Sequence, residues 1–371
     1  MMVLPMAEIH VIEDRDVWNA FVTALPIADL RQSYEWGEIR RRQGWTPLRL
    51  AAVDRGKGIA GLAVVTRWLP GLGVVAYAPR GPMLDPDDSH GWEALPSLAG
   101  AVHEMSGAVF LRVSPGVPGE RTDVVRRLAR AGFVELHDFW PLWNTPRNVM
   151  RLSVTGTERE LLAGMAAKRR QHIVSSAAKK GVTTEVTTER SALRELHAML
   201  VVHAAHQGYP VRDWGHFEAL HAAFAPSDSL CVVLGRVHGT LVSALLGLRF
   251  GNVAHTLYAA TVESPPAAPV GDAIHWTWIR WAREVGCTDI DFGSSGTHVP
   301  PRPADTNFGI YRFKEELGAR LLLNVGYHDC VFQPARYRLA RLVERQALPR
   351  AWRGLSRLPA GVRAMLSWRA A

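Results

Sequence analysis

The chain has 371 residues, of which 47% are hydrophobic and 21% charged, a size and balance that suit two globular domains. No stretch of 18 uninterrupted apolar residues occurs, and the N-terminus lacks a basic segment followed by an apolar one, so we expect a cytoplasmic protein without a transmembrane helix or signal peptide. Three distant cysteines, Cys231, Cys287 and Cys330, do not form a disulfide framework, and we expect them to be packing residues.

The net charge of +8 comes from the C-terminal segment. Between Pro334 and Ala371 there are nine arginines and one acid, Glu344. Leucines and tryptophans are interleaved with these arginines, and Pro349 and Pro359 divide the segment into short helical pieces. Such a basic amphipathic tail is typical of contact with an anionic membrane surface or with RNA. A packing helix with a solvated basic face, or a flexible tail, would give the same pattern.

The first half of the chain predicts an antiparallel meander. Leu48–Asp54 and Ile59–Trp68 are expected to be strands joined by the turn Arg55–Gly58, and Gly73–Tyr77 a third strand. The second half repeats the pattern. Its predicted strands are Ser229–Gly235, Thr240–Phe250 and Val253–Thr261. The common order predicts a duplicated unit.

Helical periodicity appears mainly in the second half. The predicted helices are Glu158–Lys180, Ser191–His206 with Ser191 as its N-cap, Trp214–Phe224, and Asp272–Val285 ended by Gly286. Cys287–Phe292 is expected to be a strand that enters the loop Phe292–Gly296.

Antiparallel hairpins mixed with helices predict an α+β fold with two domains. We expect a first domain over residues 1–150, to which residues 327–371 return, and a second domain over residues 151–326.

Several segments share the order and spacing of one known family. They include an N-terminal aromatic block, two proline-containing loops, a basic helix, an apolar helix with its following strand, and a Phe-Lys block near the C-terminus. These segments are Gln32–Arg40, Leu69–Gly73 with Tyr77–Pro82, Phe110–Pro115, Met165–Val182, Trp276–Gly293, and Asn307–Lys314 followed by Gly318.

Taken together, these blocks resemble the FemABX family, whose members attach amino acids from aminoacyl-tRNA to peptidoglycan precursors. The resemblance implies two acetyltransferase-like (GNAT-like) domains in tandem with a cleft between them. Because no sustained heptads are present, we expect the compact form without a helical arm. The implied reaction forms a peptide bond to an amine of a nucleotide-linked (UDP-MurNAc-peptide) or lipid-linked muropeptide, as in interpeptide bridges. The resemblance implies aminoacyl-tRNA as co-substrate and no cofactor or metal.

The resemblance also assigns roles to single residues. Lys314 matches the lysine of the family's Phe-Lys block and would stabilise the oxyanion formed during ester aminolysis. Arg40 and Arg212 fall near phosphate-binding positions, and Tyr258 and Phe313 near substrate-binding positions. From residue types alone, Lys314, Arg40 and Arg212 could equally be surface residues and Tyr258 a core residue. Arg80 is expected to lock its loop by bonding carbonyl groups.

A second group of basic residues is a candidate for binding the tRNA acceptor arm. It lies on the predicted helix Glu158–Lys180 and consists of Lys168, Arg169, Arg170, Lys179 and Lys180. A solvated helix face would explain the same residues.

Two positions depart from the family pattern. Ser114 stands where an acid often precedes the proline of the third block, so that residue cannot be a general base, and the proton of the incoming ammonium must go to the substrate or to another residue. Asp291 is available but could simply cap the loop. Glu315 and Glu316 follow Lys314 where relatives are usually more basic. These departures keep a small natural product or an exopolysaccharide-linked acceptor open.

Three other functions are each suggested by part of the sequence. An acyl-CoA N-acyltransferase needs backbone amides that hold a pyrophosphate at a helix N-terminus, but the corresponding segment, Pro265–Asp272, contains three prolines. A metal hydrolase could use His197, His203 and His206 as metal ligands, but these histidines lack a carboxylate partner at metal-ligand spacing. A non-catalytic tRNA- or membrane-binding module would use the basic tail.

Overall fold

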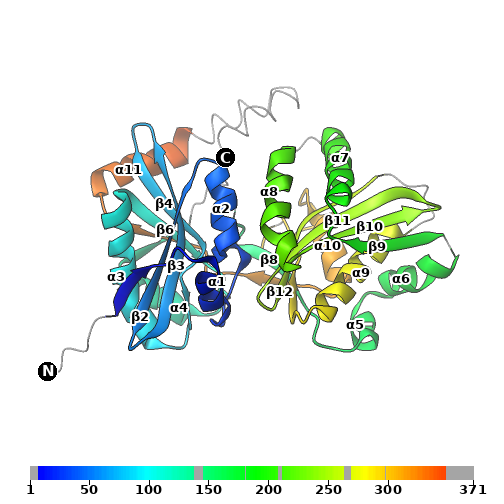
Figure 1. Ribbon diagram of the computed structural model, residues 1–371, viewed down its shortest axis with the longest axis horizontal. Helices are drawn as coiled ribbons and strands as arrows, with labels where there is room; N and C mark the ends of the chain where they lie inside the picture. The colour runs from blue at the N-terminus through cyan, green and yellow to red at the C-terminus, as the bar shows by residue number, and fades with distance from the viewer. Residues whose placement is uncertain are drawn as a thin grey trace. The chain divides into compact units, whose positions relative to one another are not determined.

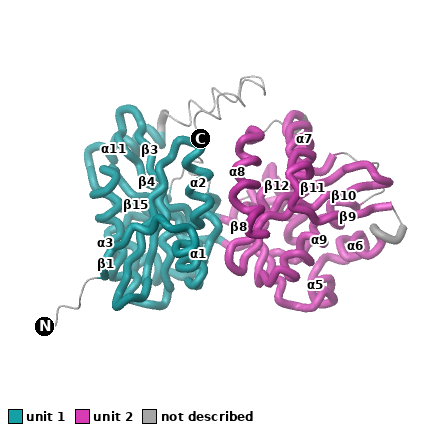
Figure 2. Tube along the Cα trace, viewed as in Figure 1, with its two compact units in different colours: residues 1–147, 323–357 teal, residues 148–322, 358–371 magenta. Residues whose placement is uncertain are grey.

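The computed structural model describes residues 7–137, 145–179, 181–207, 211–262, 269–296 and 298–347, apart from the side chains of residues 176–179, 206, 207, 346 and 347. The chain forms two compact units (Figures 1 and 2). The first unit contains the chain up to Arg147 and a C-terminal segment that starts at Leu323. The second unit runs from Asn148 to Leu322. The domain boundaries predicted at residues 150 and 326 stay a prediction.

The first unit is a mixed sheet flanked by helices. Its elements are β1 (Glu8–Val11), α1 (Arg15–Thr23), η1 (Leu30–Gln32), α2 (Tyr34–Arg42), β2 (Thr46–Asp54), β3 (Lys57–Leu69), β4 (Gly73–Arg80), β5 (Met83–Leu84), α3 (Ser89–Ser106), β6 (Ala108–Pro115), α4 (Thr122–Arg130), β7 (Phe133–Leu136), β15 (Tyr327–Val331), α11 (Pro334–Leu342) and η4 (Val343–Ala347).

Both faces of this sheet are covered. Alternate residues along β3 and β4 point to opposite faces. On one face, Leu62 and Ala76 belong to a core cluster with residues of α3 and α4. On the other face, Val65 and Tyr77 belong to a cluster that contains Ala340 of α11. Helices α4 and α11 therefore cover opposite faces of the first sheet.

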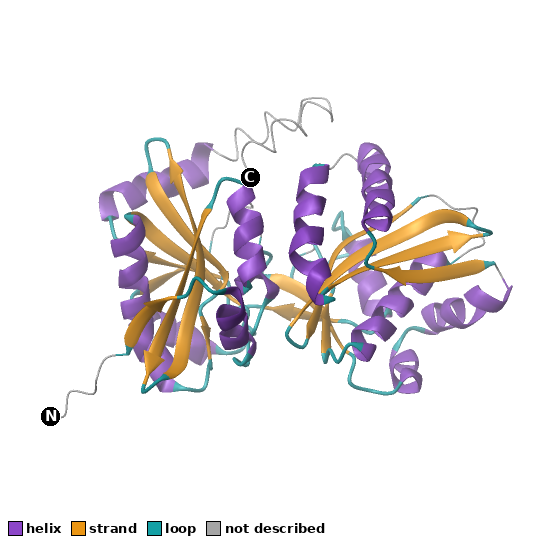
Figure 3. Ribbon diagram, in the orientation of Figure 1, coloured by secondary structure: helices purple, strands orange, loops and turns teal. Residues whose placement is uncertain are grey.

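The second unit has the same kind of architecture. Its elements are β8 (Asn148–Ser153), α5 (Glu158–Gly164), α6 (Ala167–Lys179), β9 (Val182–Thr187), α7 (Arg190–Gln207), α8 (Trp214–Phe224), η3 (Ala225–Ser227), β10 (Leu230–Val237), β11 (Thr240–Phe250), β12 (Val253–Thr261), α9 (Val270–Glu284), β13 (Asp289–Asp291), α10 (Phe308–Glu316) and β14 (Arg320–Leu323). Helices α7 and α8 lie on one side of the sheet, and α6 and α9 on the other (Figure 3).

The two sheets repeat one strand order. The first runs β1-β2-β3-β4-β6-β15-β7, and the second, taken from β9, runs β9-β10-β11-β12-β13-β8-β14. The pairs β4–β6 and β12–β13 are parallel, at equivalent places in the two sheets. The predicted α+β class and the duplicated antiparallel meander are therefore confirmed.

The sixth position of each sheet is filled by an exchanged strand. β15 lies between β6 and β7 of the first sheet, although it follows β14, the last strand of the second sheet. In the second sheet the equivalent strand is β8, which follows β7 in the chain, and β7 is an edge strand of the first sheet. Each sheet is therefore completed by a strand that comes directly after the end of the other.

Two predicted helices need correction. The single helix predicted over Glu158–Lys180 is two helices, α5 and α6, because Met165 is extended (ψ 155°) and the amide of Ala166 donates to the carbonyl of Glu316 at 2.9 Å. Ser191 is not an N-cap, since α7 already begins at Arg190. The strand predicted over Cys287–Phe292 is shorter, and β13 contains only Asp289–Asp291.

Helix α9 packs closely on the second sheet. A side chain at Gly247 of β11 would overlap the indole ring of Trp278, and one at Gly235 of β10 would meet Ile274 and Val270. These two glycines let the buried face of α9 approach the strands directly. The close approach fixes the position of Asp272 and His275, which lie on the same helix.

The remaining expectations on composition have these outcomes. Cys231 and Cys287 are buried and Cys330 is half-buried, and burial raises the pKa of each thiol, as expected for packing residues. No helix in the described part of the chain is long and apolar enough to cross a membrane, and none exceeds the 18 residues of α3 and α7. Most of the basic tail, from residue 348 onward, lies outside the described residues.

Candidate active site

Lys314 lies in the last turn of α10, half-buried in the second unit. Its Nζ donates a hydrogen bond to the carbonyl oxygen of Ser294 at 2.7 Å. Burial lowers the pKa of this lysine from its ordinary value of 10.5 to about 8, and the negative charge of Asp291 opposes the shift. An ammonium group has three donors, and the bond to Ser294 uses one of them.

The loop after β13 holds the lysine's partner in place. The carboxylate of Asp291, at the end of β13, accepts from the amide of Gly293 at 2.7 Å. The hydroxyl of Ser294 donates to Asn148 Oδ1 at 3.0 Å. Gly293 and Gly296 have φ values of +74° and +65°, which glycine adopts at little cost. Asp291 therefore caps the loop, as one interpretation of the sequence predicted.

An ion-pair network that includes α6 and α9 also holds α10 in place. Asp272, buried in the first turn of α9, pairs with Arg169 at 3.1 Å and with His172 at 2.6 Å. Arg169 also pairs with Glu316 of α10 at 2.9 Å. Its guanidinium lies 4.7 Å from the centre of the Phe313 ring. The residues on both sides of Lys314 in the last turn of α10 are therefore held by one arginine.

His275 is a neutral neighbour of this network. Its Nδ1 lies 2.7 Å from the carbonyl oxygen of Gly271, so in the neutral ring that nitrogen donates. Burial, together with the positive charges of Lys314 and Arg169, lowers its pKa to about 4, against the opposing bond to Gly271 and the charge of Asp272. The ring packs edge-on against Phe313 at 4.9 Å. The imidazole is therefore uncharged at neutral pH and adds no second cation beside Lys314.

Tyr258 and Arg212 interact electrostatically in the second unit. The Tyr258 hydroxyl lies 3.0 Å from His216 Nε2, and its ring lies 4.9 Å from that of Phe217. Burial raises the pKa of Tyr258 to about 12, and the charge of Arg212 opposes the shift. Tyr258 is thus a half-buried hydroxyl within the electrostatic influence of an arginine.

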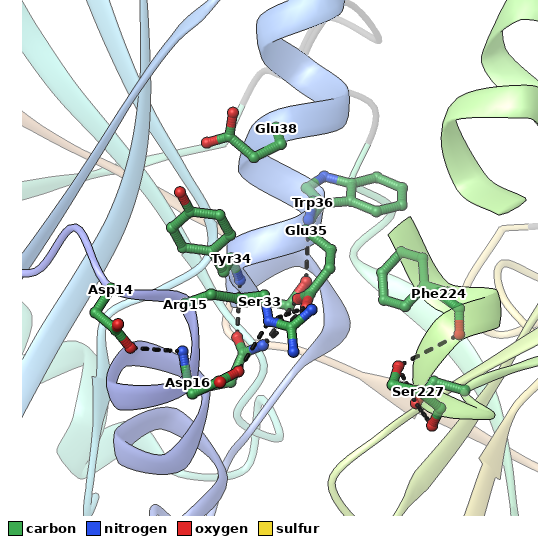
Figure 4. Close-up of polar contacts among 12 residues, drawn as sticks. Asp14, Arg15, Asp16, Ser33, Tyr34, Glu35, Trp36, Glu38, Phe224 and Ser227 are labelled. Atoms are coloured by element: carbon green, nitrogen blue, oxygen red, sulfur yellow. Dashed lines mark hydrogen bonds and ion pairs between the residues drawn. The ribbon is translucent and has the colours of Figure 1, made fainter. Parts of the chain in front are cut away.

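Arg40 lies in the last turn of α2, in the first unit. Its guanidinium lies 4.9 Å from the centre of the Trp45 ring and donates to Gln43 Oε1 at 2.6 Å. The start of α2 is firmly capped, because Ser33 accepts from the amide of Trp36 at 3.1 Å and Glu35 accepts from Asn19 at 2.9 Å (Figure 4). The helix that carries Arg40 is therefore anchored at its other end.

Ser114 belongs to a buried polar cluster of the first unit. Its hydroxyl lies 3.2 Å from the hydroxyl of Tyr77 and accepts from the amide of Arg80 at 3.2 Å. Arg80 is buried and donates to the carbonyl of Pro146 at 3.0 Å. Arg80 thus bonds a backbone carbonyl, as expected, but one in residues 145–147 and not in its own loop.

The candidate tRNA-binding residues are not equivalent. Lys168 and Arg170 are exposed, whereas Arg169 is half-buried and engaged by Asp272 and Glu316. The side chain of Lys179 and all of Lys180 lie outside the described residues. Of this group, Lys168 and Arg170 are the exposed cations, and Arg169 is held inside the network around α10.

Sequence reasoning missed the joint role of Asp272, His172 and His275. Asp272 is 103 positions from Arg169 and 100 from His172, so no local pattern connects them. One signal was available, because a carboxylate in the first turn of an otherwise strongly apolar helix is costly to bury without a partner. This signal predicts that Asp272 has a partner, but it does not identify the partner residue.

The chain is similar to known proteins in both of its units. A model described as the FemAB family matches residues 14–130, and a model described as an acetyltransferase (GNAT) domain matches residues 164–314. The lipid II:glycine glycyltransferase of Staphylococcus aureus strain MRSA252 is 23% identical over an alignment 398 residues long, gaps included. The alignment covers 88% of this chain and 93% of that protein.

Solved structures show the same fold. The crystal structure of FemX superposes with a TM-score of 0.82 at 19% identity, over 91% of this chain and all of that one. A tandem GNAT protein from the clavulanic acid biosynthesis pathway superposes with a TM-score of 0.50 at 10% identity, over 87% of this chain and 97% of that one. The protein is therefore a transferase built from two GNAT-like domains in tandem.

The order of the two family models and the alignment along most of the chain narrow the class further. The chain belongs to the FemABX family of aminoacyltransferases.

Proposed function

We propose that the protein transfers an amino acid from aminoacyl-tRNA to an amine of a peptidoglycan precursor, either nucleotide-linked or lipid-linked. The observation that supports this most directly is Lys314, a partly desolvated ammonium held against the loop after β13. The similarity to a lipid II:glycine glycyltransferase over 88% of the chain supports the choice of acceptor.

The proposed reaction is the aminolysis of an ester. The acceptor amine attacks the ester carbonyl, a C–N bond forms, and the bond to the tRNA 3′-terminal oxygen breaks. The amine loses a proton and the departing oxygen gains one, so the proton can pass within the substrates. Lys314 would stabilise the negative oxygen of the tetrahedral intermediate through its remaining N–H groups. No covalent enzyme intermediate is required.

The other predicted residues keep their proposed roles. Arg40 and Arg212 would bind phosphate oxygens of the precursor, for which a guanidinium is well shaped. Tyr258 would contact substrate within reach of Arg212. Phe313 would line the site beside Lys314, and Lys168 and Arg170 would contact tRNA. The proposed location is the cytoplasm, where charged tRNA occurs.

The start of the helix that follows each meander argues against an acyl-CoA donor. A helix N-terminus binds a pyrophosphate when it is free of competing anions. Here Asp88 caps α3, accepting from the amide of His90 at 3.0 Å, and Asp272 lies buried in the first turn of α9. A carboxylate therefore stands at both helix starts. Asp88 occupies an amide that a pyrophosphate would need, and Asp272 is already engaged by Arg169.

The test is transfer of labelled amino acid to a muropeptide. Purified protein is incubated with total charged tRNA and with nucleotide-linked or lipid-linked muropeptide, with and without RNase. We expect product that depends on intact tRNA, and a loss of about a hundredfold or more in Lys314→Ala, the scale seen when a key oxyanion donor is removed. Lys57→Ala is the matched control, because Lys57 is an exposed lysine at the start of β3.

Different failures have different meanings. RNase-sensitive transfer to small molecules or to an exopolysaccharide-linked substrate, but to neither muropeptide, would move the acceptor and keep the reaction class. Product that requires acyl-CoA and survives RNase would disprove the proposed donor. Full activity of a folded Lys314→Ala variant would remove the assigned cation.

A further inference from the structure

We propose that a groove between β7 and α11 in the first unit binds anionic phospholipid headgroups at a membrane surface. The groove has a volume of about 630 Å³. Its lining is mostly apolar, with three arginines along one side. It is lined by Val134, Glu135, Leu136, His137, Tyr337, Arg338, Arg341, Leu342 and Arg345.

Apolar side chains are exposed at the rim of this groove. Val134 of β7 and Leu342 of α11 line the groove and are 57% and 50% exposed. Leu339, outside the lining but three residues before Leu342 on α11, is 45% exposed. Arg338 and Arg345 are exposed beside them, and Arg338, Leu342 and Arg345 recur at a spacing that puts them on one helical face. Exposed leucines between arginines are typical of a helix that lies in the interface of an anionic membrane.

The groove stands on a rigid base. Arg112 of β6 is fully buried and pairs with Asp329 of β15 at 2.7 Å and with Glu344 of η4 at 2.8 Å. Glu344 also pairs with Arg341, and the Tyr337 hydroxyl donates to Asp329 at 3.1 Å. Arg341 is buried at this base, whereas Arg338 and Arg345 are exposed and place positive charge at the rim.

Charge selects the occupant. The chain's own C-terminal tail, residues 348–371, contains five arginines and no acid. The groove lining has three arginines against one acid, Glu135, so its net positive charge disfavours the tail. RNA is anionic, but its backbone gains nothing from exposed leucine and valine. A phospholipid matches both parts of the surface, because its phosphate pairs with arginine and its acyl region covers the apolar rim.

This inference does not depend on the proposed acceptor. It rests on the groove alone, and it would place the protein at a membrane surface with any substrate. Vesicle binding needs neither tRNA nor muropeptide, so it can fail while transfer succeeds, or succeed while transfer fails.

The experiment is co-sedimentation of the full-length protein with vesicles of phosphatidylcholine alone, or mixed with phosphatidylglycerol. We expect binding to the mixed vesicles that weakens with added salt. The double variant Arg338→Glu/Arg345→Glu should lower that binding by about tenfold or more, since each basic residue near an anionic surface contributes about a factor of five. The variant Leu339→Ser/Leu342→Ser should also weaken it and leave the remainder more sensitive to salt.

The matched control is Arg126→Glu/Arg130→Glu. These exposed arginines lie on α4, which covers the opposite face of the same sheet, so the control has the same charge change and the same tail. Its vesicle binding should stay near that of the unmodified protein. Thermal unfolding checks each variant, and Arg338→Gln/Arg345→Gln replaces the charge reversal if that variant does not fold.

Two results would overturn the proposal. Equal vesicle binding by the unmodified protein and both groove variants would mean that the tail or another surface contacts lipid. A charge-reversal variant that loses binding to total tRNA in a mobility-shift assay, but keeps vesicle binding, would mark the groove as an RNA surface. Transfer to a water-soluble, nucleotide-linked acceptor should be unchanged in all these variants, which separates this test from that of the proposed function.

Discussion

At the scale of single residues, the choice of lysine at position 314 is informative. The chain contains only five lysines among its 43 basic residues, so arginine is its usual cation. A lysine ammonium is a compact charge whose pKa responds to burial, whereas a guanidinium is planar and stays charged. Lys314→Arg keeps the charge and changes the shape. We expect it to recover only a small part of the activity lost in Lys314→Ala, measured as kcat/KM for aminoacyl transfer.

The lowered pKa of Lys314 predicts opposite pH effects on activity and stability. If the ammonium is the active form, activity contributed by Lys314 should fall as pH rises through about 8. Stability should behave differently, because between about 8 and 10.5 the unfolded lysine binds more protons than the folded one, so the free energy of unfolding rises with pH. The measurements are pH profiles of transfer and of chemical unfolding.

In Lys314→Met both effects should be reduced. An unchanged fall in activity above pH 8 in that variant would assign the pH dependence to another group, such as the substrate amine.

The buried Arg112 predicts a large loss of stability. Removing one member of a buried ion pair leaves uncompensated charge, which costs about 3–5 kcal/mol, and Arg112→Ala would leave Asp329 and Glu344 in that position. The check is urea unfolding. Arg121→Ala is the control, since Arg121 also pairs with two carboxylates, Asp87 and Asp123, but in an exposed place. Its unfolding midpoint should hardly move.

Sequence reasoning was more limited for residue roles than for fold. The position of Lys314 could be predicted from its motif, but its partner Ser294 and its lowered pKa depend on how α10 meets the loop after β13. Arg169 was grouped with its neighbours as a cation for tRNA. Its engagement by Asp272 and Glu316 could not be predicted, because the three lie on different helices.

At the scale of elements, the contact of α9 with β11 predicts a sharp contrast between two glycines. Gly247→Ala should destabilise the protein by about 1–3 kcal/mol or more, because the new methyl group overlaps the ring of Trp278. Gly100→Ala should be neutral or stabilising by up to about 1 kcal/mol, since Gly100 lies inside α3 with open space around it. Thermal unfolding of both variants tests this. Equal melting temperatures would contradict the described packing.

Elements defined by local pattern were predicted well, and elements defined by tertiary contacts were not. The strands β11 and β12 have the predicted limits, because glycine turns and apolar alternation bound them. The break between α5 and α6 was missed. It occurs where the amide of Ala166 bonds to the carbonyl of Glu316, a residue 150 positions away. Gly164 ends α5 and was a local signal, but a single glycine inside an otherwise helical pattern is often tolerated.

At the scale of the whole molecule, the exchanged strands predict how truncation acts. A chain ending at Leu322 lacks β15, so β6 and β7 lose their common neighbour, whereas β8 to β13 are retained. We expect amide hydrogens of β6 and β7 to exchange rapidly in this truncated chain while those of β10–β12 stay protected. A chain ending at Ala347 keeps β15 and α11 and is the control. Protection of β6 equal to that of the control would show that β15 is dispensable.

The exchange of strands also bears on the order in which the protein can be completed during synthesis. The second sheet has all its strands once β14 has been made, but the first, although it begins earlier, waits for β15. Between β7 and β15 the ribosome adds about 190 residues, which at bacterial rates takes about 10–40 s. During that time the edges of β6 and β7 that β15 will pair with are unpaired, and any extended segment could bind there. The N-terminal half of the chain is therefore the last to become native, and the half in most need of protection from aggregation while translation continues.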